Sequence, residues 1–235
     1  MNVRLVLTPT RKDHSSRGRA KHPLAGAKSL QIALKRVIDI GVSLGACLLL
    51  SPVFALIALL IKLDSKGPII FAARRVGLGG RVFRMYKFRS MVPDAVEMLP
   101  RLEHLNQGGR YMIKIPNDPR VTRVGRILRR FSLDELPQLV NVLKGDMSLV
   151  GPRPQAPDEV ALYKDEEKLR LSVPAGLTGL WQVTARDDPR FDVLVSLDLE
   201  YVRNWSLWLD IKIIAKTLRI VALGGAPRPG QTTTC

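Results

Sequence analysis

The longest feature of the hydrophobic pattern is an apolar run from Ile40 to Ile61, 22 residues without a charged side chain. As a helix rising about 1.5 Å per residue, this run would reach about 33 Å, roughly the thickness of a hydrocarbon core. It is too long for a secretory signal, and the following KLDSKGP offers no cleavage site of small residues. The pattern therefore predicts a membrane helix.

Ser51 and Pro52 lie at the middle of this run. Proline removes a backbone donor and crowds the preceding turn, and a neighbouring serine hydroxyl can satisfy the carbonyl set free, so we expect a kink. Basic residues flank the run on both sides, so the positive-inside rule gives no direction. A kinked spanning helix and a re-entrant helix both fit this pattern.

The segments around the membrane run differ in pattern. Residues 1–34 are basic, rich in small and turn-forming residues and without an apolar period, which predicts a disordered tail that contacts anionic headgroups. After the run, two short β-prone stretches flank GLGG and predict a small hairpin. Residues 92–115 look helical and then loop-like, and Asp118-Pro119 marks a turn.

Two later stretches have helical spacing of apolar residues with basic residues beside them. In the first, Val121, Val124, Leu128 and Phe131 share a face, and the arginines cover a broad opposite arc. That arc is either a solvated charged face or a surface for headgroup phosphates or a phosphorylated substrate. The second, from Leu207 to Ala222, predicts a helix that lies in the membrane interface or packs on the core.

Asp134 and Glu135 follow the arginine-rich stretch directly. Ser132 and Glu135 have capping-box spacing and Lys144-Gly145 resembles a helix end, which predicts a helix from about Leu133 to Lys144. At its start both carboxylates should be ionised. Because adjacent helical residues point about 100° apart, the two have different roles.

On that helix, Asp134 shares a polar stripe with Gln138 and Asn141, which indicates a polar cavity. Glu135 either closes the capping box or acts in the same site. Further along, Pro152 and Pro154 stiffen the backbone around Arg153. Its guanidinium is therefore either a held fork for phosphate oxygens or a solvated arginine in a proline-rich loop.

Composition limits the partners. The chain has 235 residues, which suits one main domain with appendages, and a formal net charge of +16, which favours anions. Nucleic acid, anionic lipid and phosphorylated small molecules all fit that charge. Two cysteines, one of them at the last position, do not predict a disulfide framework.

Several long motifs together resemble one family, the bacterial initiating sugar transferases, also called polyprenyl-phosphate hexose-1-phosphate transferases or monotopic phosphoglycosyl transferases. The motifs are KRVID, the central SP, KFRSM, DPRVTRVGRILRRFSLDELPQLVNVLKGDMSLVGPRP, PAGLTGLWQVTARDD and LDLEYVRNWSLWLDIKII. The resemblance covers roughly Leu34 to Leu223 and looks closest to the short enzymes that start exopolysaccharide synthesis.

The resemblance implies an α+β fold, a mostly helical monotopic membrane protein with a small β-hairpin and interfacial amphipathic helices. Residues 35–62 would form a re-entrant membrane helix hinged at Ser51 and Pro52. Residues 63–223 would form the catalytic domain on the cytoplasmic face of the bacterial inner membrane, and residues 224–235 a flexible tail. A homo-oligomer is left open.

The resemblance also implies a reaction. Asp134 would attack the β-phosphate of a UDP-hexose, with galactose or glucose favoured, release UMP and pass the sugar phosphate to undecaprenyl phosphate. Glu135 would serve Mg²⁺ or the transferring phosphate, and Asp198 matches an acidic position tied to the metal site. The phosphate-contact candidates are Arg153, Lys87, Arg89 and Arg186. For the last three a structural pairing role fits as well, and TARDD departs from the serine-glycine pair of many relatives before Arg186.

Two other functions remain as alternatives. A catalytically silent membrane scaffold for polysaccharide assembly would keep the fold without using the intact Asp134-Glu135 pair. A membrane-attached nucleic-acid binder would use the arginines on phosphates, but it would predict interleaved aromatic residues and no need for Asp134. We therefore expect no nucleic-acid partner.

Overall fold

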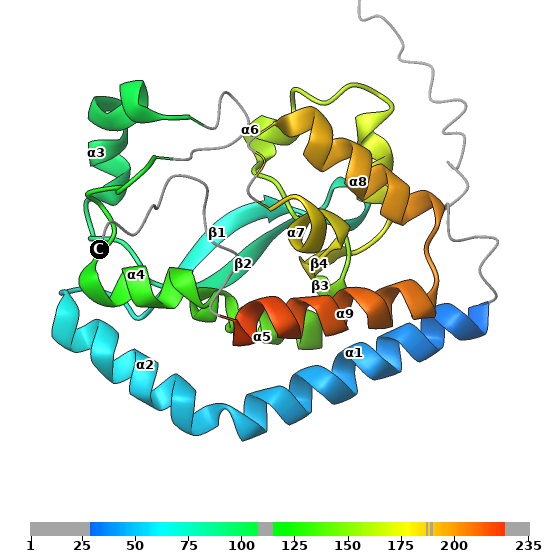
Figure 1. Ribbon diagram of the computed structural model, residues 1–235, viewed down its shortest axis with the longest axis horizontal. Helices are drawn as coiled ribbons and strands as arrows, with labels where there is room; N and C mark the ends of the chain where they lie inside the picture. Colours follow the sequence, from blue (N-terminus) through cyan, green and yellow to red (C-terminus); the bar gives the residue numbers. More distant parts are fainter. Residues whose placement is uncertain (1–28, 108–114, 187, 189, 224–235) are drawn as a thin grey trace, which may run out of the picture.

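The computed structural model describes residues 29–107, 115–186, 188 and 190–223. Helices surround two small sheets (Figure 1). The helices of eight or more residues are α1 (Ser29–Leu49), α2 (Ser51–Asp64), α3 (Ala95–Leu102), α4 (Arg123–Arg130), α8 (Phe191–Arg203) and α9 (Leu207–Ala222). The shorter helices are α5 (Gln138–Lys144), α6 (Pro157–Val160), α7 (Leu180–Thr184) and the 3₁₀ turns η2 (Leu78–Gly80), η3 (Glu103–Leu105), η4 (Leu133–Glu135) and η5 (Glu167–Ser172).

The predicted kink is present between α1 and α2. No single helix in the described ranges has the length and apolar composition of a membrane span, whereas α1 and α2 together have them and bend by 61° at the break. Pro52 cannot donate to the carbonyl of Leu48 four residues earlier, and the Ser51 hydroxyl donates to that carbonyl instead at 2.8 Å. The serine therefore compensates for the proline in the way the sequence predicts.

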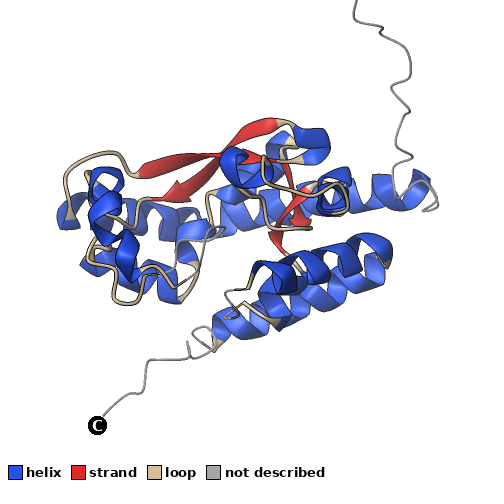
Figure 2. Ribbon diagram, turned by 90° about the horizontal axis from the view of Figure 1, so that it is seen from above, coloured by secondary structure: helices blue, strands red, loops and turns tan. Residues whose placement is uncertain are grey.

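The predicted hairpin is also present. β1 (Ile70–Val76) pairs antiparallel with β2 (Val82–Phe88), and Ala73 lies opposite Met85. Gly79 and Gly80 in the connection have positive φ values of 64° and 82°, which favour glycine. A second sheet, separate in Figure 2, pairs β3 (Met147–Val150) in parallel with β4 (Ala175–Thr178). The mostly helical α+β architecture agrees with the prediction.

The main core lies between the two sheets and α5, α8 and α9. Its most deeply buried side chains are Val142, Val150, Val202 and Ile213, each at most 1% exposed. Helix α1 is joined to this core by polar contacts: Arg36 donates to the carbonyls of Val142 at 2.6 Å and Leu143 at 2.9 Å. These carbonyls end α5, so the first half of the bent pair is fixed to the domain.

The single helix predicted from Leu133 to Lys144 is wrong. The chain forms the short turn η4 first, and α5 begins only at Gln138. Pro137 has no N–H to donate and takes the N-cap position of α5, so the helix cannot run through it. The predicted end is confirmed, because Gly145 caps α5 with a φ of 85°.

The first predicted basic helix, α4, begins one residue after Thr122, whose side chain accepts from the N–H of Gly125 at 3.0 Å. Leu128 on its apolar face is buried against α2 and β2, as the spacing predicts. A Cβ at Gly125 would lie 2.1 Å from the carbonyl oxygen of Ser90. Glycine therefore lets α4 approach the end of the hairpin closely.

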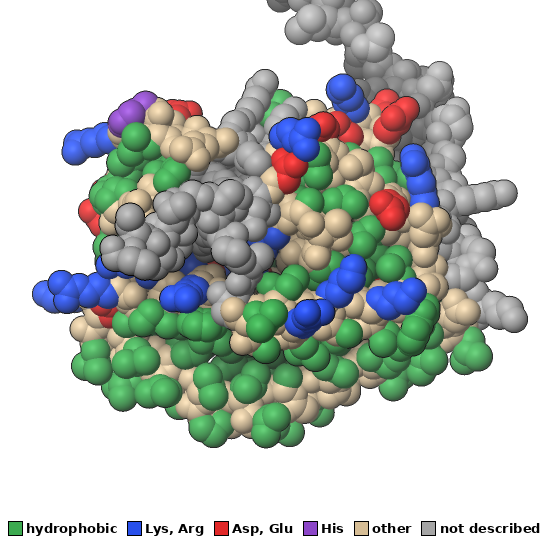
Figure 3. Space-filling model, in the orientation of Figure 1, with side chains coloured by type: hydrophobic (Ala, Val, Ile, Leu, Met, Phe, Trp, Pro, Cys, Tyr) green, Lys and Arg blue, Asp and Glu red, His purple; other side chains and the backbone are tan. Residues whose placement is uncertain are grey.

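Helix α9 has the predicted bounds, packs on the core with one face and leaves apolar side chains exposed on another. Ile213 and Asp210 are buried in the domain, while Trp208 and Leu218 are 63% and 66% exposed. In Figure 3 hydrophobic side chains cover the lower edge of the molecule, where α1 and α2 run, and lysine and arginine side chains form a row above them at the level of α4 and α9. Such a surface suits a lipid interface.

Three predicted segments are placed differently or lie wholly or partly outside the described residues. Helix α1 begins at Ser29, so residues 29–34 of the expected tail are helical. The rest of that tail, the segment 224–235 and part of the stretch 92–115 lie outside the described residues. Within that stretch, α3 and η3 confirm the helical part, and a turn is present at Asp118-Pro119.

Candidate active site

The Asp134-Glu135 pair lies in the turn η4 between α4 and α5. Ser132, just before it, has a left-handed backbone with φ 57°, which is uncommon for a residue other than glycine. The Ser132 side chain makes no capping hydrogen bond, so the predicted capping box does not form. Glu135 is therefore not a helix cap, and its carboxylate has other partners.

Those partners are two of the predicted phosphate-binding residues. Lys87 Nζ, from β2, donates to Glu135 Oε1 at 2.8 Å, and Arg153 Nη2 donates to the same oxygen at 3.2 Å. Burial opposes ionisation of Glu135, but Lys87 and Arg153 outweigh it and hold the pKa of Glu135 below its ordinary range. Glu135 is thus a fixed negative charge between two cations.

Asp134 differs from Glu135 both in its bonding partners and in the direction of its pKa shift. It is 9% exposed, and within the described part of the chain its carboxylate makes no hydrogen bond and no ion pair. The pKa of Asp134 is raised above its ordinary value. Burial and the adjacent Glu135 charge raise it, and they outweigh the lowering effect of Lys87, Arg129 and Arg153. Among the described residues, no side chain or backbone group bonds this buried carboxylate, and the charges of Lys87, Arg129 and Arg153 act on it, so it is available to an incoming electrophile.

The other two predicted phosphate contacts are placed at different distances from this pair. Arg186 Nη1 donates to the hydroxyl of Ser132 at 3.0 Å, so its exposed guanidinium lies at the edge of the site. Arg89 is buried and donates to the carbonyl of Ser65 at 2.6 Å and to its hydroxyl at 2.9 Å. Its hydrogen bonds connect the end of β2 to the residue after α2, which agrees with the structural alternative for Arg89.

Asp198 is not beside Glu135 in any acidic cluster. It lies in α8, is 1% exposed and pairs with the buried guanidinium of Arg170. Burial raises the pKa of Asp198 to about 6 against the opposing effect of Arg170. In the described ranges, no group of three or more histidine, cysteine, aspartate or glutamate side chains could hold a metal ion.

The sequence model of the bacterial sugar transferases matches residues 30–224. The chain belongs to the bacterial sugar transferase family. The match includes every site residue named above, so the Asp134-Glu135 turn, the two cations on Glu135 and the Asp198-Arg170 pair all lie within the family region.

Three curated relatives show how this sugar transferase compares in length. It is 46% identical over 198 residues to "Galactosyl transferase CpsE" of Streptococcus agalactiae, which covers 84% of this chain and 44% of that protein. It is 46% identical over 199 residues to "Undecaprenyl-phosphate galactose phosphotransferase" of Salmonella typhimurium, covering 83% and 42%. It is 43% identical over 193 residues to "Exopolysaccharide production protein ExoY" of Rhizobium meliloti, covering 80% and 85%. The chain thus spans less than half of the first two relatives and most of the third.

The residues of this sugar transferase fit a magnesium ion only in part. Mg²⁺ in phosphate-transfer sites is commonly held by one or two carboxylates together with substrate phosphates and water. Asp134 and Glu135 offer such carboxylates, and both cations on Glu135 use the same oxygen. Asp198 does not fit as a ligand here, because its carboxylate is buried against Arg170.

Two arginines near the site escape prediction from the sequence. Arg170 lies three residues after Glu167, in a stretch without a clear apolar period. Nothing in that stretch indicates that Arg170 pairs with Asp198. Arg75 lies in β1, where its Nη1 is 3.6 Å from Glu159 Oε2, and burial lowers its pKa. Both pairings join segments far apart in sequence, so spacing carries no signal for them.

Proposed function

We propose that this protein transfers hexose-1-phosphate from a UDP-hexose, galactose or glucose, to undecaprenyl phosphate. The observation that carries the proposal is the buried Asp134 carboxylate, which has no bonding partner among the described residues, beside a Glu135 held by Lys87 and Arg153. Family membership supports the chemistry, as do the names of two relatives, the galactose phosphotransferase of Salmonella typhimurium and "Undecaprenyl-phosphate glucose phosphotransferase" of Komagataeibacter xylinus, the latter 46% identical over 198 residues.

In the first half-reaction, an Asp134 carboxylate oxygen attacks the β-phosphorus of the UDP-hexose. The bond from that phosphorus to the bridging oxygen breaks, and UMP leaves with the bonding electrons. The sugar phosphate stays on Asp134 as an acyl phosphate. A carboxylate needs no general base to attack, but its anionic target needs charge neutralisation.

Lys87 and Arg153 supply that neutralisation from the protein. Their positions on Glu135 place two cations beside Asp134, and Arg186 adds a third at the rim. Mg²⁺ bound at the Asp134-Glu135 turn would neutralise further charge on the diphosphate. In the second half-reaction, a phosphate oxygen of undecaprenyl phosphate attacks the same phosphorus, and the Asp134 carboxylate leaves unchanged.

UMP release tests this function directly. Purified protein in detergent with Mg²⁺, undecaprenyl phosphate and UDP-galactose or UDP-glucose should form UMP and a polyprenyl diphosphate sugar. Asp134→Asn should lower the rate by at least about 1,000-fold, because the amide is a poor nucleophile. Asp192→Asn, at an exposed position in α8, is the matched control and should keep full activity. Release of UDP, or an Asn variant with normal rate, would contradict the proposal.

We also propose that α1 and α2 together form a re-entrant membrane helix, bent at Ser51 and Pro52, which leaves the tail and the catalytic domain on the cytoplasmic face of the inner membrane. Support comes from the 61° bend, the fixed contacts of α1 with the domain and the exposed apolar faces of both helices. Anionic lipids would contact the basic row above those faces (Figure 3).

Cysteine labelling tests this topology. With Cys47 and Cys235 replaced by serine, a single cysteine placed in residues 1–28 should be protected from an impermeant reagent in intact cells. Pro52→Leu should straighten the helix and make that cysteine reactive. A tail cysteine that labels from outside in the unsubstituted sequence would contradict re-entry, and an unchanged pattern in the Leu variant would contradict the hinge role of Pro52.

A further inference from the structure

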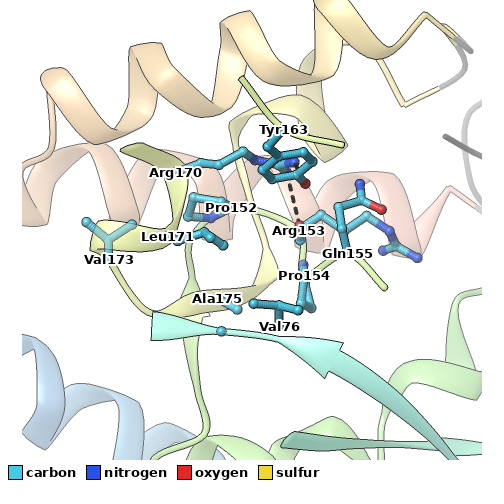
Figure 4. A pocket seen from close by; sticks show the side chains of 11 residues that line it. Val76, Pro152, Arg153, Pro154, Gln155, Tyr163, Arg170, Leu171, Val173 and Ala175 are labelled. Atoms are coloured by element: carbon cyan, nitrogen blue, oxygen red, sulfur yellow. Dashed lines mark hydrogen bonds between the residues drawn. The ribbon is translucent and has the colours of Figure 1, made fainter. Parts of the chain in front are cut away.

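Arg170 makes a buried set of contacts behind the active site. It lies in η5, is 3% exposed, and its Nη2 donates to the backbone carbonyl of Arg153 at 3.0 Å. Its guanidinium also donates to the hydroxyl of Tyr163 and pairs with Asp198. Figure 4 shows Arg170 and Tyr163 together at one side of a small cavity, with a hydrogen bond from Arg170 to Arg153.

These contacts have a defined physical effect. A buried guanidinium needs an opposite charge, which Asp198 supplies at 1% exposure, and acceptors, which Tyr163 and the Arg153 carbonyl supply to Nη1 and Nη2. Nε of Arg170 is buried and has no acceptor among the described residues. Because the guanidinium is planar, these contacts also fix the direction of the N–H that points at the Arg153 carbonyl. Arg170 therefore presents a rigid hydrogen bond to one carbonyl, that of Arg153.

The position of that carbonyl matters because its neighbours are prolines. Pro152 and Pro154 restrict the backbone on both sides of Arg153, so few torsions remain between the fixed carbonyl and the Arg153 side chain. That side chain is 32% exposed and reaches Glu135 Oε1 at 3.2 Å. A chain of contacts thus runs from Asp198 through Arg170 and the Arg153 backbone to Glu135.

We propose that Arg170 is a positioning residue that aims Arg153 at the reacting phosphate, and that Asp198 and Tyr163 act by holding Arg170. The kinetic part of this inference rests on the proposed transfer reaction. In this account Asp198 acts through a protein contact and does not need to bind a metal.

The first test compares Arg170→Lys with Arg203→Lys, an exposed arginine at the end of α8. A lysine keeps the charge but cannot bridge Asp198, Tyr163 and the Arg153 carbonyl together. We expect kcat for UMP release to fall about tenfold in the first variant, because misplacing Arg153 weakens its contact with the transferring group. The Arg203 variant should match the unsubstituted protein.

Hydrogen exchange supplies a readout that does not depend on turnover. The amides of Arg153 and Gln155 should exchange faster in Arg170→Lys, while those of α8 residues 194–202 should not change. If the unsubstituted protein releases no UMP, the proposed function fails, and exchange still decides whether Arg170 holds this segment. Unchanged exchange at Arg153 would overturn the positioning role.

A double-mutant cycle tests whether Arg170 acts through Arg153. In an Arg153→Gln background, Arg170→Lys should cause no further loss of kcat beyond about twofold. Losses that multiply would show that Arg170 acts independently and would overturn the proposal. If Arg170→Lys does not fold, Tyr163→Phe takes its place, since it removes one partner of the guanidinium and should give a smaller loss of the same kind.

Magnesium titration separates the two roles of Asp198. Asp198→Asn keeps an oxygen that can accept from Arg170 but removes the charge. A positioning role predicts a lower kcat, an unchanged Mg²⁺ concentration at half-maximal rate and faster exchange at Arg153. A rise in that concentration, with unchanged exchange, would assign Asp198 to the metal and overturn this part of the proposal.

Discussion

Two lysine-carboxylate pairs in this protein have nearly the same length and different surroundings. Lys35 Nζ lies 2.6 Å from Asp210 Oδ2, and Lys87 Nζ lies 2.8 Å from Glu135 Oε1. Asp210 also accepts from the hydroxyl of Tyr201 at 2.9 Å and from Trp205 Nε1 at 3.3 Å. Lys35 has a second partner, the carbonyl of Val150, at 3.1 Å.

The surroundings differ as a structural pair and the pair of the proposed active site should differ. Around Asp210 the donors come from α1, from α8 and from the connection between α8 and α9, and both charged side chains of the pair are at most 10% exposed. At Glu135, two cations share one carboxylate oxygen, and the side chain of Arg153 is 32% exposed. Burial raises the pKa of Asp210, whereas the cations lower that of Glu135. The second site therefore keeps positive charge available for a ligand.

We call the buried Lys35-Asp210 pair the closed pair and the Lys87-Glu135 pair the open pair. The largest expected effect is a loss of stability when the closed pair is broken. Lys35→Met leaves Asp210 buried without its cation, so the free energy of unfolding should fall by about 3–5 kcal/mol. Lys168→Met removes a lysine whose ion pair with Asp165 is solvent-exposed. This variant should change the free energy of unfolding by less than about 1 kcal/mol. Denaturant unfolding in detergent measures both. Equal effects would contradict the structural role of the closed pair.

At the open pair, the larger effect should be on activity. Lys87→Met should lower kcat/KM for UDP-hexose about 100-fold, because it removes one of the cations that neutralise negative charge in the transition state. Its thermal unfolding midpoint should stay close to that of the unsubstituted protein. Lys144→Met, also near β2 but exposed and bonded to Tyr86, is the control and should keep its activity. A Lys87 variant that is unstable but fully active would reverse the comparison.

Asp118 tests the effect of pH on a pair outside both sites. Arg120 donates to both of its oxygens, at 2.9 and 2.7 Å, and these bonds hold the pKa of Asp118 below the ordinary 3.8. A lowered pKa adds stability that is present above pH 3.8 and is lost as the pH falls through the folded-state value. Asp118→Asn should therefore cost about 2 kcal/mol at pH 7 and less at pH 3. If Asp118→Asn lowered the free energy of unfolding more at pH 3 than at pH 7, the expected direction of the pH dependence would be wrong.

The smallest effect is expected at the rim of the open site. Arg186 is exposed, and its field is screened by water and salt. Arg186→Gln should raise KM for UDP-hexose about threefold and leave kcat nearly unchanged. Steady-state kinetics at low and high salt check this, and a large loss of kcat would move Arg186 into the group that contacts the reacting phosphate.

The sequence predicts those features that depend on local spacing. The break at Ser51-Pro52, the hairpin around GLGG and the bounds of α9 follow from proline chemistry, β-prone runs and helical periodicity. Pairing between distant segments leaves no such pattern. The contacts of Arg170 with Asp198 and of Lys35 with Asp210 join residues 28 and 175 positions apart.

The active-site turn shows where local signals conflict. Ser132 and Glu135 have the spacing of a capping box, but Pro137 prevents the helix from starting at Leu133. Glu135 then bonds Lys87 and Arg153, whose positions depend on β2 and on the loop after β3. The residue types of the site could be predicted from the sequence, but the partner of each carboxylate could not.

The central claim is that Asp134 carries the transferred phosphosugar. The most direct measurement incubates the protein with UDP-hexose labelled in the sugar, without undecaprenyl phosphate, and maps the adduct by mass spectrometry after rapid quenching. The account predicts one hexose-phosphate on the peptide that contains Asp134, none in Asp134→Asn, and loss of the adduct when undecaprenyl phosphate is added. Product formation without any adduct on Asp134 under the same conditions would contradict it.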